Sequence, residues 1–212
     1  MDYFDEFEFK SPKQQRTKKV IDDLVESLEL LAQSEDLTQI TTRNLSDISG
    51  YALGTIFHHF KKFDDIFVYF FLIRRKKATL IIIDIINQHP ADLPLSILIS
   101  KVNNHYFYEL SRPNRKALLF LMHQFFKCTQ SPELINIIAD SLIPYWMEAS
   151  VRDKTNTIFN FSENELKLRF RAMQSIVRSP FFEDDPIAGT KEHKDIAFKL
   201  FMQMFTNTDL IE

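Results

Sequence analysis

The chain of 212 residues contains only three glycines, Gly50, Gly54 and Gly189. Glycine-rich phosphate loops need several positions with positive φ or with backbone held against phosphate, so dinucleotide-binding and Walker-type loops are excluded. An all-β sandwich or barrel would need Gly, Asn and Asp at many tight turns. The glycine content therefore predicts an all-α protein.

Charge and cysteine content restrict the class further. With 26 Lys and Arg against 29 Asp and Glu, the net charge of -3 argues against coating nucleic acid by bulk charge, although it allows a local basic patch. The single cysteine, Cys128, excludes an internal disulfide and a Cys-rich zinc site. The acidic start, MDYFDEFEF, is unlike a secretory signal, and the longest apolar run, Ile66 to Ile73, is far shorter than the ~20 residues that span a bilayer. We expect a cytoplasmic protein with no membrane span and no cofactor.

The first third of the chain predicts three helices. Residues 1–15 show no periodicity, and we expect them to form a mobile arm. From Arg16 to about Ser34, apolar side chains recur at three- and four-residue steps, as in an amphipathic helix. Thr41 is a suitable N-cap for a short second helix, and Gly50 is suited to end it in the left-handed conformation. A third short helix follows from Leu53, so residues 16–62 are predicted to form a helix-turn-helix domain.

Longer helices punctuated by proline are predicted for residues 63–212. A strand at Leu80–Ile86 is the competing local interpretation, because Ile is β-branched. A helix is favoured because the sequence offers no partner strands. Pro144 is expected to kink the helix in which it falls. The predicted helices cover 64–88, 95–110, 114–127, 131–153, 162–178 and 190–205, the fourth opened by Ser131-Pro132 and the fifth by a capping box from Ser162 to Glu165.

The two short helices carry a recognisable signature. It reads Thr41-x-x-x-Leu45-Ser46-x-x-Ser49-Gly50-x-x-x-Gly54-Thr55-Ile56-Phe57-His58-His59-Phe60-Lys61, followed by Asp64-Asp65-Ile66-Phe67. This stretch resembles the DNA-binding signature of the tetracycline-repressor (TetR) family, over about residues 16 to 70. The resemblance implies an all-α homodimeric repressor, with an N-terminal DNA-binding head and a C-terminal helical domain that binds a small molecule and dimerises.

The resemblance also implies which residues meet double-stranded DNA. In helix-turn-helix proteins the second short helix enters the major groove, with Ile56 and Phe60 here facing the core. Three departures from the family pattern, Ala52, Phe57 and Phe63, each remove a donor to phosphate; Lys61, Lys62 and the basic stretch from Lys10 to Lys19 offer compensation. The implied DNA-binding residues are Thr41, Thr42, Arg43, Leu53, Gly54, Thr55, His58, His59, Lys61 and Lys62.

Two further sites are expected in the C-terminal domain. Aromatic and polar-tipped side chains on its central helices suggest a cavity for a small apolar or aromatic effector. The expected pocket residues are His105, Tyr106, Phe120, His123, Phe126, Tyr145 and Trp146. Apolar stripes on the last two helices, in a chain with 21 phenylalanines, suggest a two-fold four-helix contact. The expected dimer-interface residues are Leu166, Phe170, Met173, Val177, Ile196, Leu200, Phe201 and Met204.

Other interpretations remain open at this point. The helix-turn-helix could be a packed helix pair that never meets DNA, and the chain a ligand-binding or protein-interaction module on the same fold. Adjacent His58 and His59 point about 100° apart on a helix and do not converge on one metal ion. Cys128 near His123 lacks an orienting third group, so no catalytic or metal-binding residue is assigned and an enzyme is not expected.

Overall fold

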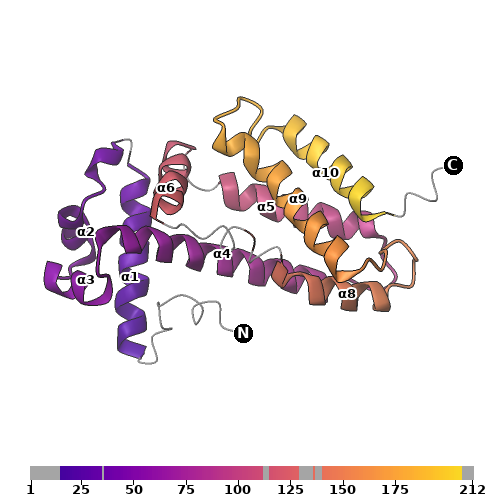
Figure 1. Cartoon of the computed structure of the whole chain (residues 1–212), viewed down its shortest axis with the longest axis horizontal. Helices are drawn as coiled ribbons and strands as arrows, with labels where there is room; N and C mark the ends of the chain where they lie inside the picture. The colour runs from indigo at the N-terminus through magenta and orange to yellow at the C-terminus, as the bar shows by residue number, and fades with distance from the viewer. Residues whose placement is uncertain (1–14, 35, 112–114, 129–135, 137–139, 207–212) are drawn as a thin grey trace. The chain divides into compact units, whose positions relative to one another are not determined.

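The computed structural model describes residues 15–34, 36–111, 115–128, 136 and 140–206. Every regular element in this part of the chain is a helix, which confirms the all-α prediction (Figure 1). The chain divides into two compact units: the first holds the described residues of Met1–Ile73 and Pro113–Gln130, and the second those of Arg74–Arg112 and Ser131–Glu212. Among the described helices, none combines the length and the hydropathy needed to cross a bilayer.

The first unit is organised around helix α1 (Gln15–Ala32). Its buried face follows the predicted periodicity and includes Ile21, Leu24, Val25, Leu28 and Leu31. The 3₁₀ helix η1 (Leu37–Gln39), α2 (Thr42–Ser49) and α3 (Leu53–His59) follow in sequence. α1 contacts both α2 and a later helix, α6 (Arg115–Cys128), so one amphipathic helix holds the head together.

The start of α4 (Phe63–Asn87) and the whole of α6 belong to this same unit. Phe67 meets Phe120 edge to face at 5.9 Å between ring centroids, and Phe71 stacks on Phe125 at 4.1 Å. The first unit therefore extends beyond the 16–62 range predicted from the sequence, because aromatic contacts with high sequence separation fasten a later helix to it. The predicted arm lies outside the described residues except for Gln15, which begins α1.

α4 is one continuous helix through Asn87, so the strand alternative at Leu80–Ile86 was wrong. Thr79, Ile82 and Ile86 are buried, at the three- and four-residue steps of one helical face. β-branched residues favour strands only weakly, and within the described residues no strand offers pairing.

The second unit contains the rest of α4, α5 (Leu95–Ser111), α8 (Ile143–Arg152), α9 (Glu163–Phe182) and α10 (Lys191–Phe205). α10 lies against both α5 and α9 and buries His193, Ala197, Phe201 and Phe205, at four-residue steps. Both ring nitrogens of His193 are satisfied: Nδ1 accepts from Gly189 N at 3.2 Å, and Nε2 lies 3.1 Å from Ile176 O. This pairing requires the neutral ring with its proton on Nε2.

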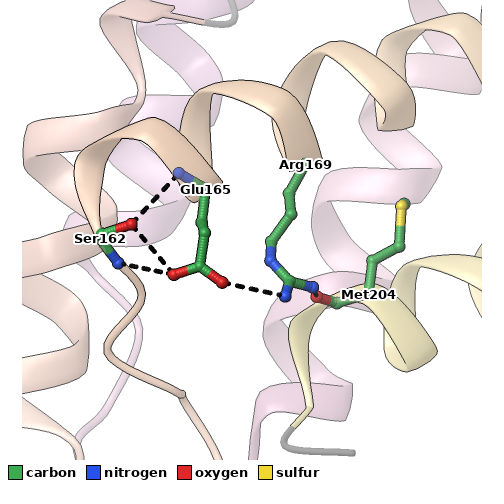
Figure 2. Close-up of polar contacts among 4 residues, drawn as sticks. All are labelled: Ser162, Glu165, Arg169 and Met204. Carbon is green, nitrogen blue, oxygen red and sulfur yellow. Dashed lines mark hydrogen bonds and ion pairs between the residues drawn. The ribbon is translucent and has the colours of Figure 1, made fainter.

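The predicted capping box opens α9 (Figure 2). Ser162 Oγ accepts from Glu165 N at 3.4 Å, while Glu165 Oε2 accepts from Ser162 N at 3.2 Å. Ser162 Oγ also donates to Glu165 Oε2 at 3.0 Å, and this hydrogen bond, together with the one from Ser162 N, lowers the pKa of Glu165. Arg169 pairs with the same carboxylate at 3.6 Å and donates to the Met204 carbonyl, so the cap also joins the start of α9 to the end of α10.

Two predicted features of the helices change at prolines. Pro144 lies in the first turn of α8, where its missing N–H costs no helical hydrogen bond, so it does not kink a longer helix there. Pro180 lies inside α9, which continues to Phe182 instead of ending at Arg178. The proposed cap at Ser131 lies outside the described residues.

Candidate nucleic-acid interface

The turn between α2 and α3 has the geometry that its residues predict. Thr41 Oγ1 accepts from Asn44 N at 3.2 Å and caps α2, and Gly50 ends it at φ 71°. Ser46 Oγ donates to Tyr51 O at 2.7 Å, which fixes the chain as it leaves the turn. The left-handed backbone conformation at this position is unfavourable for any residue with a Cβ. Gly50 therefore sets the direction in which α3 leaves the turn.

α3 has two distinct faces. Ile56 and Phe60 are each only 1% exposed, which confirms that they face the core. On the other side Leu53 is 45% and Phe57 47% exposed, and His58 is exposed as well. A short helix that presents apolar and imidazole side chains together to solvent offers contacts of the kind that read base edges, including the methyl group of thymine.

A surface hollow of about 620 Å³ runs beside this helix. Its lining combines basic, hydroxyl and imidazole side chains from α1, the turn and α3: Arg16, Thr17, Lys19, Val20, Tyr51, Thr55, His58 and His59. Cations and hydroxyls in a concave surface are the groups that contact phosphate and sugar, and they fix the register of a protein on a duplex. The net charge of the chain is negative, so this basic surface is a local feature.

The electrostatics of the hollow are set by a few neighbours. Burial lowers the pKa of His59, and the adjacent His58 lowers it further, so the His59 ring is neutral at neutral pH and offers one donor and one acceptor. Tyr51 donates its hydroxyl to Asp23 Oδ2 at 2.7 Å. That hydrogen bond is the main cause of the raised pKa of Tyr51, and it holds the phenol at the edge of the hollow.

The three departures from the family pattern have visible structural consequences. Ala52 occupies the N-cap of α3 and makes no side-chain cap, so the N–H groups there receive no side-chain acceptor. Phe57 is half-exposed with a hydrocarbon ring where a phenol would donate. Phe63 meets Phe67 edge to face at 5.3 Å, so its ring anchors the start of α4.

The structure places the residues implied by the resemblance on the surface of the first unit. Exposed are Thr41, Arg43, Leu53, Gly54, His58, Lys61 and Lys62, and partly exposed are Thr42, Thr55 and His59. Five lining residues of the hollow lie outside the predicted DNA-binding set: Arg16, Thr17, Lys19, Val20 and Tyr51. Arg16 and Lys19 belong to the basic stretch that the sequence offered as compensation for lost phosphate donors, and their three-residue spacing places them on one helical face.

The predicted pocket residues fall in both units. Phe120, His123 and Phe126 belong to the first unit, where His123 is exposed on α6. His105, Tyr106, Tyr145 and Trp146 belong to the second unit. Within the second unit, His105 Nε2 lies 3.2 Å from Ala78 O, and Trp146 is buried against Phe170 and Phe205 at 5.6 and 4.6 Å. Trp146 thus acts as a core residue of this unit.

The residues of the predicted dimer interface differ in how far they are exposed within the single chain. Five of its members are buried inside the chain's own second unit: Leu166, Phe170, Met173, Val177 and Phe201. α10 turns its apolar face toward α5 and α9, so these side chains offer no surface for a partner to cover. Ile196 and Leu200 remain 43% and 36% exposed, and Met204 is partly exposed.

Comparison with known proteins identifies the fold. No protein-family model matches the sequence, and no curated protein matches it. Solved structures do match, among them two candidate transcription regulators. One is a candidate TetR-family transcription regulator from Shewanella sp. PV-4, with 14% identity and a TM-score of 0.53 over 89% of this chain and 98% of that one. The fold is the TetR fold.

The second match agrees with the first. It is a candidate TetR-family transcriptional regulator from Mesorhizobium loti MAFF303099, with 10% identity and a TM-score of 0.60. The alignment covers 92% of this chain and 100% of the other. Nearly the whole length of each TetR-type protein is thus represented here, including the helices that follow the helix-turn-helix.

Proposed function

We propose that this TetR-fold chain is a DNA-binding transcriptional regulator that responds to a small molecule and acts in the cytoplasm as a homodimer. The single observation that carries the proposal is the basic hollow beside α3, which Arg16 and Lys19 line together with Thr55 and His58. Phosphate contacts would come from α1 and base contacts from the exposed face of α3. A negatively charged or purely apolar surface at this place would have favoured a protein partner.

The proposed mechanism is geometric. A dimer reads two half-sites about 34 to 36 Å apart, so a pseudo-palindromic operator is expected. An apolar or aromatic effector in the second unit would release the operator if it bound better to the conformer with the wrong head separation. The loss of operator affinity can be no larger than that differential binding energy. The chain would then act as a repressor relieved by its effector.

The test begins with selection of a binding site from random duplexes, followed by titration of the selected operator. Replacing His58 and His59 together by Ala removes two side chains at the hollow with little effect on folding, since His58 is exposed and His59 partly so. Base contacts contribute about 1–3 kcal/mol each, so operator affinity should fall at least about tenfold. His123→Ala, at an exposed histidine on α6 of the same unit, is the matched control.

Two results would argue against the proposal. Failure to enrich any sequence would favour the alternative of an interaction module without DNA binding. Unchanged operator affinity in the double histidine variant would remove α3 from the reading surface.

For the homodimer, the exposed part of α10 is the proposed contact. Leu200→Asp introduces a charge on its surface while leaving the buried Phe201 in place, so the variant should sediment as a folded monomer. Val151→Asp, at an 80% exposed position on α8, makes the same change as a control and should remain dimeric. A wild-type chain that is monomeric at micromolar concentration would remove both the dimer and the two-half-site mechanism.

A further inference from the structure

Tyr51 ties the turn before α3 to α1. Its hydroxyl donates to Asp23 Oδ2 at 2.7 Å, although the two residues are 28 positions apart. Its backbone is held as well, because Tyr51 N donates to Ser49 Oγ at 3.3 Å and Tyr51 O accepts from Ser46 Oγ at 2.7 Å. Backbone and side chain are therefore both fixed in the free protein, so a contact made by this phenol would cost little conformational entropy.

The phenol lies on the surface that is proposed to meet DNA. It lines the hollow together with Thr55 and His58 from α3 and with Arg16 from α1. Tyr51 comes two residues before Leu53, the first residue of α3. In helix-turn-helix proteins, the N-terminal end of the second short helix is the part that contacts base edges. The phenol therefore shares one concave surface with groups suited to bases and with a cation suited to phosphate.

The contact with Asp23 decides the hydrogen-bonding character of this phenol. A phenol has one hydrogen to donate, and its oxygen can also accept. The hydrogen is donated to Asp23, and among the described residues no group donates to the oxygen. The hydrogen bond to Asp23 is the main cause of the raised pKa of Tyr51, so the phenol keeps its proton at neutral pH. Tyr51 thus presents an acceptor to the hollow.

The DNA backbone cannot use this acceptor. Phosphate and deoxyribose within a strand offer acceptor oxygens and no N–H or O–H donor. Turning the phenol hydrogen toward a phosphate would only exchange one anionic acceptor for another. It would also leave the Asp23 carboxylate without its donor beside a phosphate, and like charges repel. The contact with Asp23 therefore disfavours Tyr51 as a phosphate anchor.

The major groove does supply a donor. Adenine presents its N6 amine there and cytosine its N4 amine, whereas guanine and thymine present acceptors and the thymine methyl group. A phenol that donates to a carboxylate is also a stronger acceptor, because hydrogen bonds in a chain polarise one another. A fixed acceptor in the groove distinguishes a base with an amine from a base with a keto oxygen.

We propose that Tyr51 reads one base in each half-site by accepting a hydrogen bond from the exocyclic amine of an adenine or a cytosine. Asp23 is the positioning residue, because it takes the phenol hydrogen and so makes Tyr51 an acceptor. This inference rests on the proposed function, since it names the base chemistry that the hollow recognises. Neither residue belongs to the DNA-binding set implied by the resemblance.

The first test repeats the operator selection with the full-length variant Tyr51→Phe. This variant keeps the ring and loses only the oxygen, and thermal denaturation checks that it folds. One position in each half-site should lose its preference for a base with an amine, while the other positions keep theirs. Tyr108→Phe, at a 60% exposed tyrosine on α5 in the other unit, is the matched control and should select the wild-type operator.

Base analogues then identify the amine itself. At the position that Tyr51→Phe affects, adenine is replaced by purine, or cytosine by the pyrimidinone that lacks the amine. The wild type should lose about twofold to tenfold in affinity per half-site, the range expected for one neutral hydrogen bond. Tyr51→Phe should show no such loss on the same duplexes. The base selected at this position shows whether adenine or cytosine is recognised.

Asp23→Ala tests the positioning role. It frees the phenol hydrogen, so Tyr51 can donate to guanine O6 or thymine O4 as well as accept. The preference for an amine at this one position should therefore weaken, and bases with a keto oxygen should be tolerated. Asp22→Ala removes the same charge from the neighbouring exposed position on α1 and should keep the wild-type preference.

The results separate this inference from the proposed function. If the wild type enriches no sequence, the proposed function fails and this inference fails with it. If an operator is enriched and Tyr51→Phe selects the same bases, DNA binding stands and the reading role of Tyr51 is wrong. An equal loss of affinity for every sequence would give Tyr51 a structural or phosphate-binding role instead. An unchanged base preference in Asp23→Ala would remove the positioning role of Asp23.

Discussion

The salt dependence of operator binding tests the basic hollow most directly. Arg16 and Lys19 are exposed cations on α1, and both line the hollow beside α3. If each neutralises one phosphate, each contributes about 0.9 to the slope of log affinity against log salt. A dimer carries two such pairs, so replacing both residues by Gln should flatten the slope by about 3.6.

The magnitude can be stated as a change in affinity. Over a fourfold increase in salt, a slope difference of about 3.6 corresponds to about 2.2 log units, or roughly 150-fold. The wild type should therefore lose roughly 150-fold more affinity than the double variant between 50 and 200 mM salt, measured by fluorescence anisotropy on the selected operator.

The control matches the change in charge. Lys101→Gln with Lys154→Gln removes two exposed cations of the other unit that lie outside α10, and changes the net charge of the chain by the same two units, from -3 to -5. Its slope should equal that of the wild type. Equal slopes for the Arg16/Lys19 variant and the wild type would refute phosphate contact at the hollow, and a flattened slope in the control would show that only the overall charge matters.

Three further predictions follow from individual contacts. Thr41→Ala removes the N-cap of α2 and should lower the free energy of unfolding by about 1 kcal/mol in chemical denaturation. An unchanged free energy of unfolding would mean that the cap does not stabilise the fold. Phe57→Tyr adds a donor on the exposed face of α3 and should tighten operator binding about fivefold per head, the equivalent of ~1 kcal/mol. The salt dependence of binding should not change. Weaker binding would instead place Phe57 against an apolar group. Burial opposes ionisation of Asp153, but hydrogen bonds from Thr155, Thr157 and Ile158 outweigh it and lower its pKa. Because the folded pKa is depressed, Asp153 stabilises the fold above the ordinary value of 3.8, and the stability is lost as the pH falls through the folded pKa. Asp153→Asn should thus lower the Tm at neutral pH, and the difference in Tm between variant and wild type should narrow below pH 3.8. A Tm difference that does not depend on pH would contradict a stabilising role for the ionised Asp153 carboxylate.

The local features of the head could be predicted from the sequence because they depend on neighbouring residues. The cap at Thr41, the left-handed Gly50 and the core-facing pair Ile56 and Phe60 are each set within one or two helical turns. The capping box at Ser162 is predictable for the same reason. Periodicity and capping chemistry act over short distances, so the residue types alone determine them.

Features that depend on packing partners were decided only by the tertiary structure. The apolar stripes that contain Phe170 on α9 and Phe201 on α10 look the same in sequence whether another helix of this chain or a second subunit covers them. In the structure, α5, α9 and α10 pack against one another and bury both side chains. Arg75 on α4 and Gln174 on α9 share a hydrogen bond across 99 sequence positions, and no spacing rule links them. Periodicity shows which face of a helix is apolar, whereas the identity of the group opposite it depends on how distant segments fold together.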